Sequence, residues 1–156
     1  TLQDMTGTIP GRREEWKKNQ SYTSPPEIPE KKKKNAHSNP EKPEIINGNT
    51  VLYGIGTSFG TVTAPACVLY GPADFEKFNT GDILIAVTTT PAWTPLFASA
   101  SAVVTDIGGP LSHSSIVARE YGIPAVMATH SATRKIQTGQ IITVDGKTGT
   151  VMIHEK

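Results

Sequence analysis

The chain has 156 residues, enough for one domain of ordinary size, and a net charge of +1 that favours neither nucleic acid nor an anionic membrane as a partner. No apolar run approaches the ~20 residues of a membrane helix, and residues 1–30 lack the pattern of a secretory signal peptide. The single cysteine, Cys67, excludes an internal disulfide, and no Cys/His group has the spacing of zinc ligands, so we expect a cytoplasmic protein without a metal site.

Residues 1–44 are expected to form a linker that is mostly disordered. They hold only 7 apolar residues, but 16 of the 29 charged residues and 6 of the 12 prolines. Residues 12–20 can form a short helix, although Trp16 alone cannot hold it on a domain. The lysines at 31–34 could bind nucleic acid, but a charge run of this length is more often a solvated tether.

From residue 45 the composition becomes that of a globular domain, with 50 apolar residues among 112 and 12 of the 14 glycines. We therefore expect one α/β domain over residues 45–156. The expected strands cover residues 50–55, 60–70, 82–87, 102–106 and 124–127, the helices 94–100 and 112–121, and a terminal hairpin 140–144 and 148–153. Alternation of strands and helices in the middle predicts a partly parallel sheet.

Chemistry is concentrated where the strand at 102–106 gives way to the helix at 112–121. Ligand sites lie at the carboxyl ends of parallel strands, and glycines there allow positive φ and a close approach of the backbone to an anion. The free N–H groups of a helix start favour a phosphate. The residues expected to stabilise a phosphate are Gly108, Gly109, Ser112, Ser114 and Ser115.

His113 lies among these donors and is the candidate catalytic residue. A neutral imidazole nitrogen is a nucleophile that can carry a phosphoryl group covalently. The chain has neither the Gly-Lys-Ser/Thr of a P-loop nor a dinucleotide-binding glycine fingerprint. The alternative is a structural histidine that caps a turn, which the glycine pair and the flanking serines make less favourable.

Two charged residues near His113 have two interpretations each. Asp106 could orient the imidazole or could cap the loop. Arg119 could support the phosphate or dock a partner, or could form a surface ion pair. We expect Trp93 to pack beneath the loop and Cys67 to be a small core residue.

The same segment resembles a known family. The motifs Gly108-Gly109 and Ser112-His113, together with residues 115–120 and 122–126, are similar to the phosphohistidine, or mobile, domain of phosphoenolpyruvate-utilising enzymes. This family includes phosphoenolpyruvate synthase, pyruvate phosphate dikinase and rifampicin phosphotransferase. The similarity extends to residues 90–97 and 144–151 and covers roughly residues 50–154.

The resemblance implies a swivelling β/β/α domain in which His113 is transiently phosphorylated on Nε2. The group would pass from a nucleotide-binding domain to an acceptor site for pyruvate, phosphoenolpyruvate or an antibiotic. ATP and Mg²⁺ would then bind to partner domains and not here, and the isolated chain would be an inactive part of a phosphotransferase. The alternative is a non-catalytic docking module that binds a protein partner, against which the intact Ser112-His113 pair argues. Leu111 stands where several synthases and dikinases have a regulatory threonine.

Overall fold

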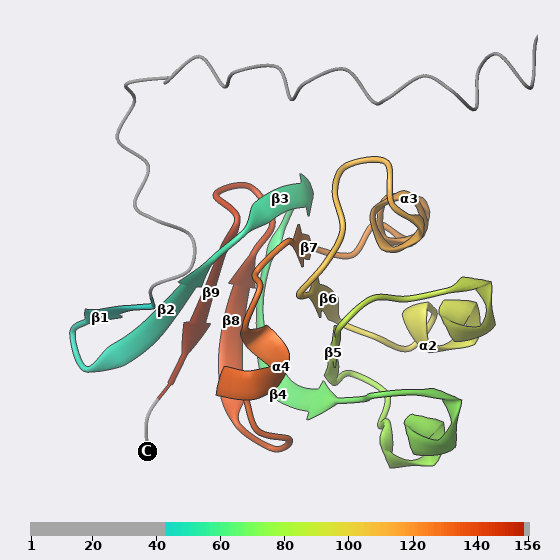
Figure 1. The fold of residues 1–156 in the computed structure, drawn as a ribbon, viewed down its shortest axis with the longest axis horizontal. Helices are drawn as coiled ribbons and strands as arrows, with labels where there is room; N and C mark the ends of the chain where they lie inside the picture. The colour runs from blue at the N-terminus through green and yellow to red at the C-terminus, as the bar shows by residue number, and fades with distance from the viewer. Residues whose placement is uncertain (1–42, 155–156) are drawn as a thin grey trace, which may run out of the picture. The chain divides into compact units, whose positions relative to one another are not determined.

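The computed structural model describes residues 43–154 (Figure 1). Residues 1–42 of the expected linker, with its short helix, lie outside them, whereas its last residue, Glu44, already belongs to a strand. The strands are β1 (Glu44–Ile46), β2 (Asn49–Tyr53), β3 (Ile55–Ser58), β4 (Thr61–Val68), β5 (Ile83–Ala86), β6 (Ala102–Thr105), β7 (Ala125–Met127), β8 (Ile141–Asp145) and β9 (Thr150–Ile153). The helices are η1 (Pro72–Lys77), η2 (Pro91–Trp93), α2 (Thr94–Phe97), α3 (His113–Tyr121) and α4 (Ala132–Lys135). Within this part of the chain, no helix is long and apolar enough to span a membrane.

The strands form one sheet in the order β1-β2-β9-β8-β4-β5-β6-β7-β3 among the described residues. Neighbours from β4 to β7 run parallel, whereas the other pairs are antiparallel. Each parallel connection passes through a helical segment, and η1, α2 and α3 all lie on the same side of β4–β7 (Figure 1). The expected α/β fold with a partly parallel sheet is confirmed.

The sheet folds back on itself because β2 continues almost directly into β3. β2 pairs with β9, whereas β3 pairs with β7 at the far end of the strand order. Gly54 makes this crossing, and its N–H donates to Gly149 O at 2.8 Å. Two β layers therefore face each other, and η1, α2 and α3 cover the outer face of the layer that contains β5, β6 and β7. This is the expected β/β/α layering.

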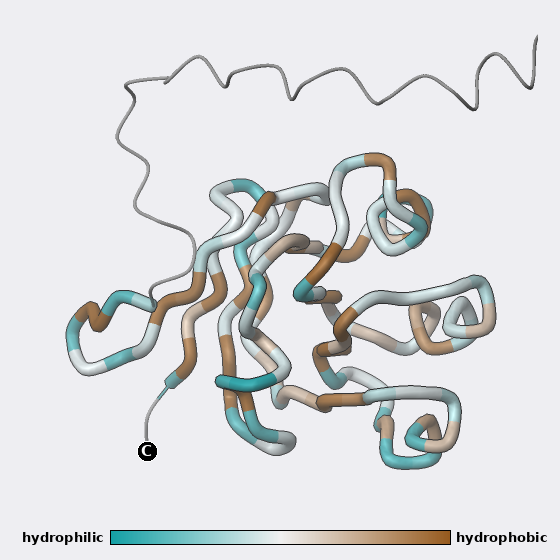
Figure 2. Tube along the Cα trace, viewed as in Figure 1, coloured by the Kyte–Doolittle hydropathy of each residue, from teal (hydrophilic) through white to brown (hydrophobic). Residues whose placement is uncertain are grey.

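Strands β5, β6 and β7 are buried at every position and are apolar except at Thr105, because both of their faces are covered. Along β5, Ile83 and Ile85 belong to the core between the two β layers, whereas Leu84 and Ala86 belong to the core beneath the helices. Figure 2 shows the hydrophobic residues concentrated on these strands. This is the continuous apolar pattern from which the sequence predicts a fully buried strand.

Several elements differ from their expected limits. The strand expected over residues 50–55 is divided at Gly54 into β2 and β3, because the chain there passes from one β layer to the other. The helix expected over residues 94–100 ends at Phe97 and is preceded by η2. β1, η1 and α4 are short elements of three to six residues that periodicity does not reveal.

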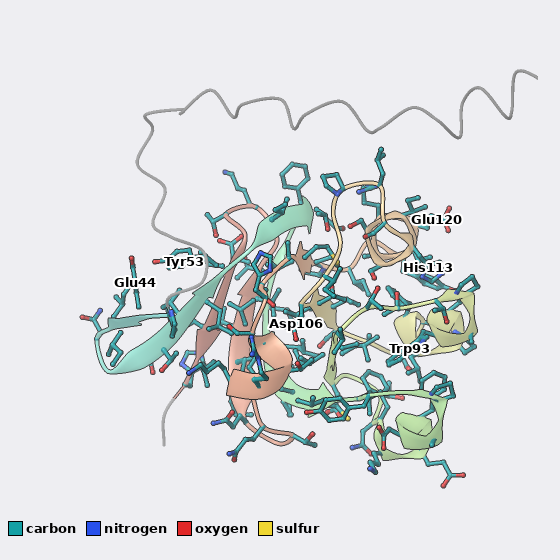
Figure 3. The ribbon with its side chains drawn as sticks, viewed as in Figure 1. Glu44, Tyr53, Trp93, Asp106, His113 and Glu120 are labelled. Atoms are coloured by element: carbon teal, nitrogen blue, oxygen red, sulfur yellow. The ribbon has the colours of Figure 1, made fainter. Side chains whose placement is uncertain are left out.

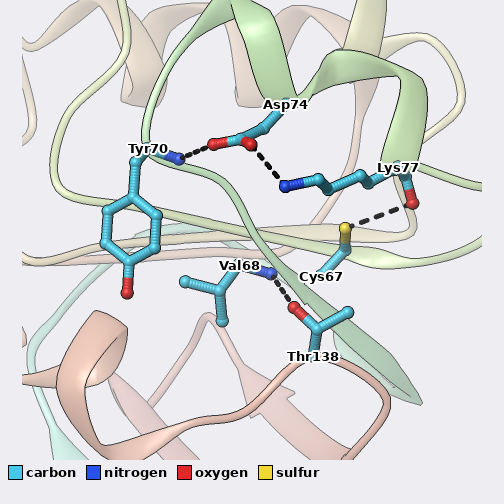
Figure 4. A network of polar contacts seen from close by, with 6 residues as sticks. All are labelled: Cys67, Val68, Tyr70, Asp74, Lys77 and Thr138. Atoms are coloured by element: carbon cyan, nitrogen blue, oxygen red, sulfur yellow. Dashed lines mark hydrogen bonds and ion pairs between the residues drawn. The ribbon is translucent and has the colours of Figure 1, made fainter.

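The connection after β4 is held by polar contacts at its surface (Figure 4). The Asp74 carboxylate accepts from Tyr70 N at 3.0 Å and from Lys77 Nζ at 2.6 Å, and these contacts hold its pKa below the ordinary range. Cys67 is fully buried, its thiol donates to Lys77 O at 3.5 Å, and burial raises its pKa. The expectation that Cys67 is a small core residue is confirmed.

We expect Gly146→Ala to destabilise the fold by about 3 kcal/mol or more, because β3 crosses the β8–β9 turn in direct contact. A Cβ on Gly146 would collide with Ser58 O, a backbone atom that has little freedom to move. Gly71→Ala is the matched control, since a Cβ there meets no atom within 4 Å. Urea unfolding measures both free energies, and equal effects of the two substitutions would contradict the close crossing.

We expect Ala128→Gly to raise the free energy of unfolding by about 0.5–1 kcal/mol. Ala128 follows β7 with φ at 56°, a left-handed conformation that strains a side chain with a Cβ. Glycine removes this strain but loses more backbone entropy on folding, so the net gain is small. Ala118→Gly in α3 should act in the opposite direction, and unfolding in urea separates the two; a loss of stability in Ala128→Gly would refute the strain.

Candidate functional site

His113 is the first residue of α3, which begins after the loop that leaves the carboxyl end of β6. Ser112 is the N-cap residue with an extended backbone, φ −69° and ψ 157°, and its N–H donates to Gly109 O at 2.9 Å. The helix ends at Gly122, which adopts the left-handed conformation. The expected helix and its closing glycine are therefore confirmed, and His113 lies at the predicted turn from strand to helix.

The imidazole of His113 is half-buried and has a hydroxyl near each nitrogen. Thr89 Oγ1 lies 3.1 Å from Nδ1 and also 2.8 Å from Ser114 Oγ. Thr94 Oγ1 lies 3.5 Å from Nε2. The ring of Phe97 packs edge-on against the imidazole, with 6.1 Å between centroids. These contacts fix the plane of the imidazole and distinguish its two nitrogens.

The carbonyl groups of the loop before His113 are bonded to the surrounding elements. Thr105 Oγ1 donates to Ile107 O at 2.9 Å, and Ser115 Oγ donates to Gly109 O at 2.7 Å. Arg119 donates to Pro110 O at 2.9 Å and to Thr57 O in β3 at 3.1 Å. Arg119 thus holds the loop against β3, in place of the surface ion pair considered from the sequence.

The first turn of α3 presents N–H groups that a helix cannot satisfy internally. Ser112 provides no side-chain cap; its Oγ lies 3.2 Å from Ser115 Oγ instead. Ser114 and Ser115 are buried, and their hydroxyls are bonded to Thr89 and to Gly109 O respectively. The backbone N–H groups at this helix start, together with the imidazole, therefore suit an anion attached to His113.

The two glycines of the loop have different roles. Gly108 has φ of 142°, and a Cβ there would lie 3.1 Å from Ser112 Oγ. Gly109 is not among the residues with positive φ, and a Cβ there meets no atom within 4 Å. Of the two loop glycines, for both of which the sequence allows positive φ, only Gly108 adopts it.

Asp106 lies apart from the imidazole, beside α4 (Figure 3). Its carboxylate accepts from Thr129 Oγ1 at 3.1 Å, from Thr133 N at 3.3 Å and from the Thr133 hydroxyl. Side chains alternate between the faces of a strand, so Asp106 shares the face of Val104, which belongs to the core between the β layers. Among the described residues, Asp106 makes no contact with His113, so the suggested role of orienting the imidazole is not supported.

Thr89 and Thr94 were not identified from the sequence as site residues. Thr89 lies in the run Thr88-Thr89-Thr90, which begins two residues after the buried strand β5, and Thr94 is the first residue of α2. The sequence did contain a signal for these residues. Their hydroxyls follow the carboxyl end of a parallel strand, and that strand lies beside the strand that leads to His113. Trp93 is 5% exposed and packs against Phe75 of η1 with 4.9 Å between ring centroids, so it is a packed residue as expected, but its ring contact is with η1.

Comparisons with known proteins agree with this geometry. Residues 78–149 match the family model described as PEP-utilising enzyme, mobile domain. The chain is 46% identical over 107 residues to the uncharacterized phosphotransferase YvkC of Bacillus subtilis, covering 69% of this chain and 13% of that protein. It is 40% identical over 111 residues to phosphoenolpyruvate synthase of Pyrococcus furiosus, covering 71% of this chain and 14% of the synthase.

A third relative is named as a rifampicin phosphotransferase. The rifampicin phosphotransferase of Streptomyces sviceus is 42% identical over 102 residues, covering 65% of this chain and 12% of that enzyme. The chain therefore spans only a small part of the length of each relative. Its matched segment contains His113, the glycine loop and both threonines that face the imidazole. Over residues 78–149, the chain is similar to the mobile domain of the PEP-utilising enzyme family.

Proposed function

We propose that this domain carries a phosphoryl group on Nε2 of His113 within a larger phosphotransferase. The observation that carries the proposal is the contact of Thr89 with Nδ1, which occupies one ring nitrogen and leaves the other as the nucleophile. Phosphoryl transfer needs a positioned nucleophile and donors for the phosphoryl oxygens. The start of α3 supplies both at one point of the sheet edge.

The tautomer of the imidazole is coupled to the direction of the Thr89 hydroxyl, which has one proton to donate. When Thr89 donates to Ser114 Oγ, its oxygen accepts a hydrogen bond from Nδ1–H. The lone pair of the neutral ring then resides on Nε2, where it can form a bond to phosphorus. The hydrogen bond also keeps the Nδ1 proton in place after Nε2 has become bonded.

The donors expected to receive the phosphoryl oxygens are chiefly backbone groups. Gly108 turns the loop, Gly109 keeps it free of side-chain bulk, and Ser112 opens the helix. Ser114 and Ser115 contribute backbone N–H groups, because their hydroxyls are bonded to Thr89 and Gly109 O. Arranged in advance, such donors stabilise the charge of the transition state.

The donor and acceptor belong to other domains in this proposal. A nucleotide-binding domain that holds ATP and Mg²⁺ would phosphorylate His113, and a separate site would pass the group to pyruvate or to the hydroxyl of an antibiotic. Similar identity to a synthase and to an antibiotic-modifying enzyme supports a carrier role that is independent of the acceptor. We also propose a cytoplasmic location, supported by the free thiol of Cys67.

We expect His113→Ala to abolish phosphorylation and turnover of the full enzyme that contains this chain, because no other group can replace the nucleophile. Substitution of a half-buried residue at a helix start should leave the fold intact. Acid-labile, base-stable phosphate measured after exposure to ATP or phosphoenolpyruvate provides the readout.

His130→Ala is the matched control, since His130 is an exposed histidine on the loop after β7. It should retain both the phosphate and the activity. Undiminished acid-labile phosphate on the His113→Ala protein would disprove the assignment.

We expect Thr89→Val to shift the imidazole of His113 toward the Nε2–H tautomer and to slow phosphorylation about tenfold, because Nδ1–H loses its acceptor. ¹⁵N chemical shifts of the ring report the tautomer directly. Thr89→Ser should restore both properties, and Thr88→Val, at an exposed position next to it, should change neither. An unchanged tautomer in Thr89→Val would contradict the role of this hydroxyl.

A further inference from the structure

We propose that the hydroxyl of Thr94 is a ligand of the phosphoryl group on His113, an inference that rests on the proposed carrier function. Thr94 Oγ1 lies 3.5 Å from Nε2, the nitrogen that Thr89 leaves free. Among the described residues, this is the only hydrogen-bond contact of that hydroxyl. It is at the outer limit of a hydrogen bond, so the hydroxyl is weakly engaged before phosphorylation.

The position of Thr94 is determined by the residues that flank it. Trp93 is 5% exposed and Phe97 is 1% exposed, so the segment from η2 to α2 is anchored by two buried aromatic rings. The ring of Phe97 also contacts the imidazole. The backbone at Thr94 is therefore held beside His113 by packing that does not involve the hydroxyl itself.

Phosphorylation of Nε2 would place new hydrogen-bond acceptors beside the Thr94 hydroxyl. In the transfer step, the lone pair of Nε2 forms the N–P bond, the bond from phosphorus to the leaving group breaks, and the leaving group takes that electron pair. The Nδ1 proton stays on the ring, hydrogen-bonded to Thr89. The phosphoryl oxygens then lie next to Nε2, within reach of Thr94 Oγ1.

A hydroxyl that donates to an anionic phosphoryl oxygen forms a charge-assisted hydrogen bond, roughly twice as strong as a neutral one. Thr94 belongs to the connection between β5 and β6, whereas the N–H groups belong to α3. The phosphoryl group is thus held from two independent elements. Thr94 therefore acts as a phosphoryl ligand, and Thr89 acts through the imidazole.

The test uses phosphoramidate, a small phosphoryl donor that phosphorylates histidine directly and releases ammonia, with the complete chain. We expect Thr94→Val to lower the rate constant for phosphorylation of His113 about tenfold. It should also raise the pH midpoint of the ³¹P titration of the phosphohistidine, since a dianion that lacks a donor holds its proton more tightly. Thr94→Ala should behave in the same way, and Thr94→Ser should restore both values.

The controls separate this inference from the proposed function. Thr88→Val, in the same connection but exposed, should match the wild type. Subtraction of the His113→Ala spectrum removes phosphate on the other histidines. Wild-type rate and midpoint in folded Thr94→Val or Thr94→Ala would overturn the role of Thr94 while leaving the carrier function intact. Absence of any signal that depends on His113 in the wild type would overturn both.

Discussion

The central constraint on this molecule is that the parallel strands β5, β6 and β7 are buried at every position. Each residue at their carboxyl ends is directed to one layer or the other by alternation along the strand. Along β6, Val104 packs between the β layers and Val103 packs beneath the helices. The same alternation continues past the strand and places Asp106 beside α4, on the opposite face from His113. A shift of one residue would exchange the two environments.

The site depends on where the hydrogen bonds of the loop are made. Ile107, Gly109 and Pro110 each have their carbonyl oxygen occupied by a side chain from β6 or α3. Because these acceptors are bonded, the first N–H groups of α3 remain available to an anion attached to His113. The side chains most expected to bind phosphate directly, Ser114 and Ser115, instead stabilise the loop and Thr89. Such an arrangement places donors in advance, so that little reorganisation accompanies phosphorylation.

The proposed carrier function requires the same geometry at each site that the domain visits, and the fold explains how that geometry is kept. His113 is held between two crossover connections of the parallel sheet, β5–α2–β6 and β6–α3–β7, whose inner faces are buried. On the other side, β3 crosses the β8–β9 turn with backbone against backbone, which is possible because glycines there have no Cβ. The imidazole is therefore positioned by rigid elements, with Thr89 as the direct link between one connection and the helix of the other.

The sequence alone determined the fold class and the helix that begins near His113, and it singled out His113 as the candidate nucleophile. Buried parallel strands have a continuous apolar pattern, glycine ends α3, and the motif Gly108-Gly109 with Ser112-His113 is contiguous in the chain. Tertiary structure alone decided which side chains face the imidazole. Thr89 and Thr94 lie 24 and 19 residues from His113, and only the pairing of β5 with β6 brings them to it. It also decided the face of Asp106, the division of β2 from β3 at Gly54 and the bonds of Arg119. These features arise from contacts between layers, which local propensity does not encode.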